Sequence, residues 1–251
     1  MAEKKGGDLK AFYVVLGVTA LIAVAAFGWS ASRSGLSGVA TQPIDAILEA
    51  EIADIQALVD MAAGVVRGDP EAPIMILEFG DFQCPACQQF ATEIKPQIDL
   101  AFVEEGVSRF VFHDFPLVRD HPHAFLAARA ARCARDQGEQ YFWPYHDRLF
   151  SLQSIWSVSQ APPLSAFENY AATIGLNTEV FEGCLRSDRY ADVVSANMRL
   201  GRELGVNRTP TILVSKEGGR SAVRMVGASD FEGFQEVIDR LLEEEDEGDG
   251  L

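Results

Sequence analysis

The stretch EFGDFQCPACQQF, residues 78–90, decides the fold, because it places two cysteines, Cys84 and Cys87, two residues apart directly after an apolar run. A pair with this spacing either binds a metal ion or makes and breaks disulfide bonds. The rest of the chain indicates which of the two applies.

A zinc site needs four ligands, which here means a second close pair of cysteines or a pair of histidines. Cys133 and Cys184 stand far apart, and a single residue separates His121 from His123. A purely structural disulfide within CPAC would close too short a loop to constrain much of the chain. The spacing therefore favours redox chemistry and predicts neither a metal site nor a cofactor.

Pro85 suits the first position of a helix, so Cys84 is expected at a helix N-terminus. Free backbone amides point at its sulfur there, and the helix dipole favours negative charge. The thiolate is the attacking species in disulfide chemistry. The dipole supplies up to about 2 kcal/mol, or roughly 1.5 pKa units. Hydrogen bonds from amides and from the Cys87 thiol must supply the rest.

Apolar runs and turn residues predict the order of elements around this pair. IMILEF, residues 74–79, is expected to be a buried strand, and VSRFVFHDFPL, residues 107–117, a second strand. Between them a helix should run to about Glu105, kink at Pro96 and end at Gly106.

The second half of the chain begins with helices. From about Pro122 to Leu204 the pattern predicts no strand. TPTILVSKEGGRSAVRMVG, residues 209–227, predicts two strands around a Gly-Gly turn, and Asp230 is a plausible N-cap for a last helix over 230–242. A strand–helix–strand unit gives a parallel pair and a hairpin adds antiparallel strands. The sequence thus predicts an α/β fold, a mixed sheet with an inserted helical domain at about 120–204.

Residues 1–33 are expected to form a cytoplasmic stub and a membrane anchor. Three lysines precede an apolar stretch over 11–29, whose 19 residues would span about 28 Å as a helix, close to the thickness of a bilayer. Lysines before the span favour a cytoplasmic N-terminus. The alternative is a signal peptide cleaved near SAS, residues 30–32. Either reading places the body of the protein on the extracytoplasmic side, where disulfides persist.

Residues 34–67 are expected to be a linker followed by a helix. Apolar residues recur at heptad-like spacing from 48 to 66. These positions are Leu48, Ile52, Ile55, Val59, Ala62 and Val66. The spacing indicates either a face packed on the domain or, through the 44–66 helix, a homo-oligomer.

The charge of the chain is strongly acidic. The formal net charge is −16, and the segment 243–251 carries six acidic residues and is expected to be a disordered tail. A net negative charge of this size repels phosphate groups, so no nucleic-acid partner is expected.

Four stretches together resemble the DsbA-like branch of thioredoxin-fold thiol–disulfide oxidoreductases. The resemblance covers about residues 68–242. The stretches are GDPEAPIMILEFGDFQCPACQQF (68–90), RFVFHDFPL (109–117), HPHAFLAARAARCARDQGEQYFWPYHDRLF (121–150) and GVNRTPTILV (205–214). It implies a thioredoxin-like sheet for the domain over 68–242.

The resemblance also implies roles for individual residues. Thr209 and Pro210 fall where the family has a cis-proline beside the cysteines, so the Thr209 backbone would pair with an extended substrate. Glu78 lies six residues before Cys84, where a buried acid could exchange protons with Cys87. A glutamate reaching solvent at the strand end is the alternative.

Similar proteins of this branch can carry a second, non-catalytic disulfide in the helical block. Cys133 and Cys184 are expected to form it here, and two free buried cysteines are the alternative. An exported domain with four cysteines favours the bridge.

The resemblance implies an enzyme that introduces disulfides into exported proteins with cysteine thiols, and a membrane redox partner that reoxidises Cys84 and Cys87. The Pro-Ala dipeptide between the cysteines lacks the histidine of strongly oxidising DsbA-type pairs, and Thr209 also occurs before the cis-proline of isomerase-like branches. A reductase or isomerase is therefore the first alternative. A non-catalytic, anchored module that binds client proteins is the second.

Overall fold

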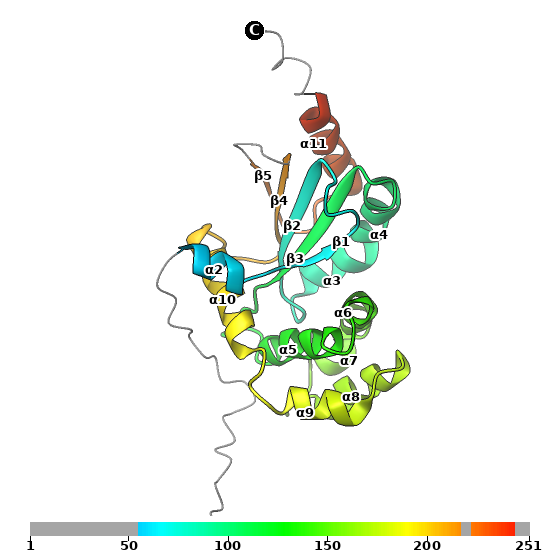
Figure 1. The fold of residues 1–251 in the computed structure, drawn as a ribbon, viewed down its shortest axis with the longest axis vertical. Coiled ribbons are helices and arrows are strands. Elements are labelled where there is room, and N and C mark those ends of the chain that lie inside the picture. Colours follow the sequence, from blue (N-terminus) through cyan, green and yellow to red (C-terminus); the bar gives the residue numbers. More distant parts are fainter. Residues whose placement is uncertain (1–54, 217–221, 244–251) are drawn as a thin grey trace, which may run out of the picture. The chain divides into compact units, whose positions relative to one another are not determined.

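The computed structural model describes residues 55–216 and 222–243, which contain a five-stranded mixed sheet (Figure 1). The strand order is β1-β3-β2-β4-β5. The strands are β1 (Val65–Arg67), β2 (Ile74–Gly80), β3 (Ser108–Asp114), β4 (Thr211–Lys216) and β5 (Ala222–Val226).

The pairing of the strands follows the prediction. β2 and β3 are parallel over their full length, from Ile74 opposite Ser108 to Gly80 opposite Asp114. β4 is antiparallel to β2 on its other side and to β5. β2 is thus the central strand, with buried residues along one face, and three residues separate its end at Gly80 from Cys84.

The connection from β2 to β3 is helical from residue 85 to 103 and covers one face of the sheet. It alternates α-helical and π-helical turns, and the turn η1 (Phe90–Ile94) ends two residues before Pro96. A proline inside a helix lacks the amide for its hydrogen bond, so the irregularity falls where the sequence predicts it. The segments are α3 (Pro85–Gln89), η1, α4 (Lys95–Ile98) and η2 (Asp99–Val103).

The last helix, α11 (Phe231–Glu243), packs beside α4 and against β2 and β4 on this face. Phe234 contacts Phe90 with ring centroids 5.7 Å apart. The Asp230 carboxylate accepts a hydrogen bond from the Gly233 amide at 3.0 Å, which confirms the predicted N-cap.

Helix α10 (Ala191–Glu203) covers the opposite face of the sheet. A Cβ at Gly201 would lie 2.6 Å from the Phe115 ring and 3.1 Å from Phe79, so the helix approaches the sheet closely at this point. Asn197 on the same helix bonds the buried His113 of β3 at 2.7 Å.

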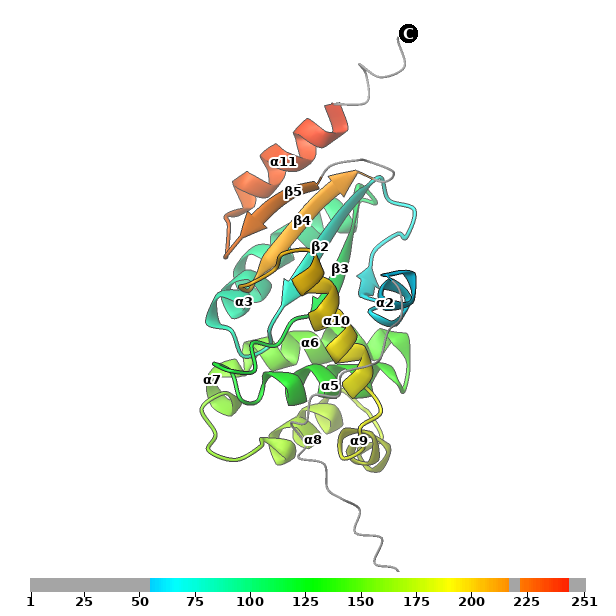
Figure 2. The same cartoon turned by 90° about the vertical axis from the view of Figure 1, so that its left-hand side faces the viewer.

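Between β3 and β4 the chain forms helices and no strand, as predicted. This helical block lies at the end of the sheet where β2 leads into α3 (Figure 2). Besides α10 it contains α5 (Ala124–Arg135), η3 (Glu139–Tyr141), α6 (Phe142–Ser151), α7 (Gln153–Trp156), α8 (Leu164–Thr173) and α9 (Thr178–Leu185).

The prediction of a helix up to residue 66 is wrong at its C-terminal end. Helix α2 covers only Ile55–Met61, and Val65–Arg67 is strand β1, antiparallel to β3. A Cβ at Gly64 would lie 2.5 Å from Val111 and 2.6 Å from His113, so the chain passes too close to β3 to remain in a helix. Of the predicted apolar positions, Ala62 is buried but Ile55, Val59 and Val66 are exposed, so they do not form one face packed on the domain. The homo-oligomer through this segment stays a prediction.

Several predicted segments lie outside the described residues. They are the anchor or signal peptide at 1–33, the linker and first helical residues at 34–54, the Gly-Gly turn, and the tail after Glu243. Among the helices in the described ranges, none combines the length and the hydrophobicity that crossing a bilayer requires.

Candidate active site

The cysteine pair lies where β2 gives way to α3. Cys84 is the N-cap of α3, with Pro85 at the first helical position, as the sequence predicts. Its amide donates to the Asp81 carbonyl at 3.0 Å, and its own carbonyl accepts from the Gln153 side chain at 2.9 Å. Gln153 belongs to α7 and also bonds the Phe82 carbonyl, so the helical block holds the loop that carries the cysteines.

The Cys84 sulfur is surrounded by groups that favour its anion. Hydrogen bonding from the Cys87 thiol, with help from the Thr209 hydroxyl and the amides of Cys87 and Ala86, lowers the pKa of Cys84 to about 5 against the opposing effect of burial. As a thiol, Cys84 donates to the Thr209 carbonyl at 3.5 Å. At neutral pH this group is therefore a thiolate.

The second cysteine has the opposite environment. Cys87 is completely buried, and the Asp81 amide donates to its sulfur at 3.4 Å. Burial, the hydrogen bond to Cys84 and the charge of Glu78 raise the pKa of Cys87 well above that of an ordinary thiol. The two sulfurs, both free in the structure, thus differ in charge and in access.

The Thr209–Pro210 peptide bond is cis and brings the start of β4 beside the cysteines. The Pro210 carbonyl accepts from the Gly227 amide at 2.9 Å, which fixes the loop to the end of β5. The Thr209 hydroxyl is buried without a hydrogen-bond partner among the described residues and can turn to the thiolate. The cis bond and its place beside Cys84 are those expected from the resemblance, and the role of both residues in binding a substrate stays a prediction.

Glu78 is completely buried, so it does not reach solvent from the strand end. Neither of its carboxylate oxygens has a hydrogen-bond partner in the described part of the chain. Burial raises the pKa of Glu78 to about 8, with Lys95 opposing the shift. The group is mainly protonated at pH 7 and can give up a proton near that pH.

Lys95 was not singled out from the sequence. Its ammonium group is buried 4.8 Å from the centre of the Phe110 ring and 4.6 Å from that of Trp143, and it pairs with Asp99 at 2.7 Å. Burial lowers the pKa of Lys95, with the charge of Asp99 opposing the shift. An i,i+4 Lys–Asp pair usually indicates an exposed helix face, so the pattern of residues does not predict a buried cation here.

Asp81 is the second residue that the sequence analysis missed. Its carboxylate is buried and accepts from the Gln83 amide and the Leu117 amide, each at 2.7 Å. The same carboxylate pairs with the His121 ring at 2.7 Å. The one feature of the sequence that could have indicated its role is its position three residues before Cys84, the cysteine at the start of a helix.

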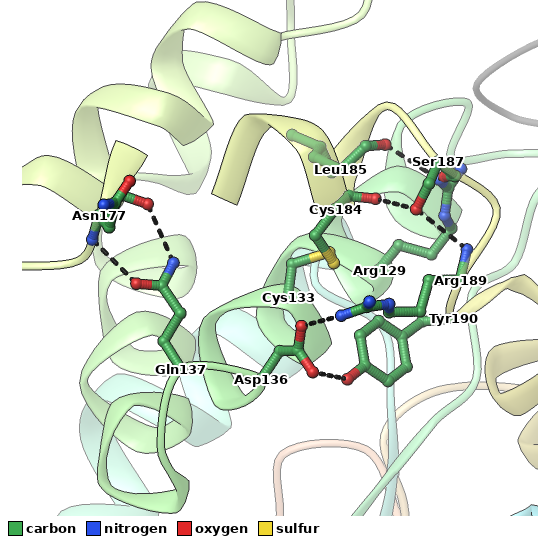
Figure 3. The surroundings of a disulfide bond; sticks show 10 residues. All are labelled: Arg129, Cys133, Asp136, Gln137, Asn177, Cys184, Leu185, Ser187, Arg189 and Tyr190. Carbon is green, nitrogen blue, oxygen red and sulfur yellow. Dashed lines mark hydrogen bonds and ion pairs between the residues drawn. A yellow bond between two sulfur atoms is a disulfide. The ribbon is translucent and has the colours of Figure 1, made fainter. Parts of the chain in front are cut away.

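Cys133 and Cys184 are joined by a disulfide bond in the helical block (Figure 3). The bond connects α5 to α9. Next to it, Gln137 exchanges two hydrogen bonds with the backbone of Asn177, at 2.9 and 3.0 Å, and Asp136 bonds Arg189 and Tyr190. The surroundings are those of a structural cross-link.

No cluster of three or more histidine, cysteine or acidic side chains in the described ranges has a geometry suited to a metal ion. The cysteine pair, the cis-proline and the buried acid lie together at the end of β2.

Comparisons with known proteins identify the family and relatives with the same fold. The thioredoxin family profile matches residues 60–240. Disulfide bond formation protein D of Bacillus subtilis is 25% identical over 177 residues, which cover 70% of this chain and 76% of that protein. A Na(+)/H(+) antiporter NhaA 3 of Salinispora tropica is 32% identical over 164 residues, 65% of this chain but only 23% of the antiporter.

Solved structures show the same fold. Oxidised BdbD from Bacillus subtilis superimposes with a TM-score of 0.63 at 25% identity, over 72% of this chain and 93% of that one. The alpha-DsbA1 protein of Wolbachia pipientis gives a TM-score of 0.65 at 22% identity, over 72% and 92% of the two chains.

The fold, the cysteine pair and these relatives define a thiol–disulfide oxidoreductase. The family match spans most of the described residues. The chain belongs to the thioredoxin family, as a DsbA-like member.

Proposed function

We propose that the protein is an oxidase that introduces disulfide bonds into exported proteins on the extracytoplasmic side of a membrane. The observation that carries the proposal is the contrast between Cys84, with a pKa lowered to about 5, and the buried Cys87, with a raised pKa. A pair of this kind is most stable when reduced, so its disulfide is readily given to a substrate.

The first step is attack on the oxidised pair by a thiolate of the substrate. The sulfur attacked is that of Cys84, because Cys84 is 8% exposed to solvent whereas Cys87 is not exposed at all. A bond forms between the substrate sulfur and Cys84, and the Cys84–Cys87 bond breaks. Its electron pair leaves with the sulfur of Cys87.

Glu78 supplies the proton for this leaving group. Its pKa of about 8 keeps the carboxyl group protonated at pH 7, and its charge acts on Cys87. Transfer of the proton leaves neutral Cys87 and a carboxylate opposite Lys95. Lys95 opposes the rise in the Glu78 pKa and so eases the transfer.

In the second step another thiolate of the substrate attacks the substrate sulfur of the mixed disulfide. The product disulfide forms, and Cys84 leaves as a thiolate, so two electrons pass from the substrate to the enzyme. Because the pKa of Cys84 is about 5, the thiolate favours the reduced state at pH 7 by at most about 2.7 kcal/mol, or about 60 mV, before screening by solvent.

The substrate is expected to lie as an extended segment along Thr209 and Pro210. The Thr209 carbonyl already reaches the Cys84 sulfur at 3.5 Å, so a peptide bonded to this backbone would have its cysteine beside Cys84. A membrane redox partner would then reoxidise the pair. The disulfide between Cys133 and Cys184 and the apolar segment at 11–29 both support an extracytoplasmic location.

The test is oxidation of a reduced, unfolded ribonuclease by the oxidised protein. We expect rapid transfer of one disulfide per enzyme, and none from Cys84→Ser. A protein that instead reduces insulin efficiently and leaves the ribonuclease reduced would be a reductase. Binding of unfolded ribonuclease that is unaffected by Cys84→Ser, without transfer, would indicate a client-binding module.

A further inference from the structure

His121 and Cys84 are linked through Asp81. The Cys84 amide donates to the Asp81 carbonyl at 3.0 Å, and the Asp81 carboxylate pairs with Nδ1 of His121 at 2.7 Å. The carboxylate is fixed by two backbone amides, from Gln83 and Leu117, so its position does not depend on the histidine. The histidine ring, in turn, has one buried and hydrogen-bonded partner.

The surroundings of His121 favour its charged form. The hydrogen bond to Asp81, the charges of Asp81 and Cys84, and that of the neighbouring Asp120 raise the pKa of His121, against a smaller effect of burial. The His121 side chain is 18% exposed, so its proton exchanges with solvent. Pro85 and Ala86, between the cysteines, carry no charge.

We propose that His121, held by Asp81, is the positive charge that stabilises the Cys84 thiolate at the surface of the active site. This inference rests on the proposed role of Cys84 and adds a residue outside the CPAC segment. Backbone amides stabilise the thiolate at every pH, whereas an imidazolium does so only below its own pKa. His121 therefore makes the oxidising strength of the pair depend on pH.

The first measurement uses the full chain with Cys84 and Cys87 reduced and the Cys133–Cys184 disulfide intact. Thiolate absorbance is titrated in wild type, His121→Gln and His121→Lys. We expect the pKa of Cys84 to rise by about half a unit to one unit in His121→Gln. His121→Lys keeps a charge and should stay near wild type. His123→Gln is the matched control, because His123 bonds the Ser159 carbonyl instead of a carboxylate.

The equilibrium of the pair with glutathione gives a second readout. At pH 7 the equilibrium constant for oxidation of glutathione should fall about three- to tenfold in His121→Gln. The difference from wild type should be largest below the pKa of His121 and fade as the pH rises through it. A purely structural histidine would give a difference that does not depend on pH.

A third measurement needs no variant. Because coupling between two titrating groups is reciprocal, the pKa of His121 should be higher in the reduced protein, which carries the thiolate, than in the oxidised protein. Magnetic resonance of the histidine rings measures both values. Equal values in the two states, or an unchanged Cys84 pKa in a folded His121→Gln, would overturn the inference. An ordinary Cys84 pKa in wild type would instead overturn the proposed function itself.

Discussion

At the residue scale, the two cysteines of the site have different pKa values because their surroundings differ. Cys84 and Cys87 are one helical turn apart, yet the pKa of the first is lowered to about 5 and that of the second is raised. The difference arises because Cys84 faces donors at the start of α3 while Cys87 faces the core and Glu78. This separation lets Cys84 act as the stable leaving group and Cys87 remain protonated.

The buried acid gives a prediction of pH-dependent stability. The folded-state pKa of Glu78 is about 8, raised from 4.5, so its contribution to stability is complete below pH 4.5 and is lost as the pH rises to about 8. Glu78→Gln should therefore stabilise the protein by about 2–3 kcal/mol at pH 7 and by much less at pH 5. Urea unfolding at the two pH values measures the difference. A gain in stability of the same size at pH 5 and at pH 7 would contradict the raised pKa of Glu78.

The CPAC segment was sufficient to predict the redox role of the two cysteines and the start of helix α3, because both depend on residues that are neighbours in the sequence. Lys95, Asp81 and His121 could not be predicted in the same way. Their environments come from residues distant in sequence, such as Trp143 over Lys95 and the Leu117 amide on Asp81.

At the element scale, strands β2 to β5 and the last helix could be predicted from hydrophobic pattern and capping. Strand β1 could not, because the helical spacing up to Val66 was overridden by the pairing of Val65–Arg67 with β3. Tertiary contacts of this kind commonly override local preference. The helical block was predicted as helical, but its position at the end of the sheet follows only from packing (Figure 2).

The disulfide between α5 and α9 should contribute to stability and not to catalysis. Its sequence separation of 51 residues corresponds to up to about 4 kcal/mol in the chain-entropy description. The double variant Cys133→Ala/Cys184→Ala should lose about 2–4 kcal/mol of unfolding free energy. Guanidinium unfolding measures the loss, and the rate of ribonuclease oxidation under native conditions is the control. A large loss of rate in folded protein would give this disulfide a part in the reaction.

At the scale of the whole domain, the active site lies where the sheet meets the helical block. Gln153 bonds the Phe82 and Cys84 carbonyls, and Gln83 bonds the Ser157 carbonyl and the His123 amide. These bonds tie the loop before α3 to α7 and to the residues around it. The helical block therefore holds in place the loop that carries Cys84.

The equilibrium of the Cys84–Cys87 pair with glutathione at pH 7 tests the central claim most directly. Stabilisation of the reduced pair by the Cys84 thiolate predicts a potential more positive than about −200 mV, toward the range of strong oxidases. A potential near about −270 mV, that of thioredoxin, would contradict it and show that the pair acts as a reductant.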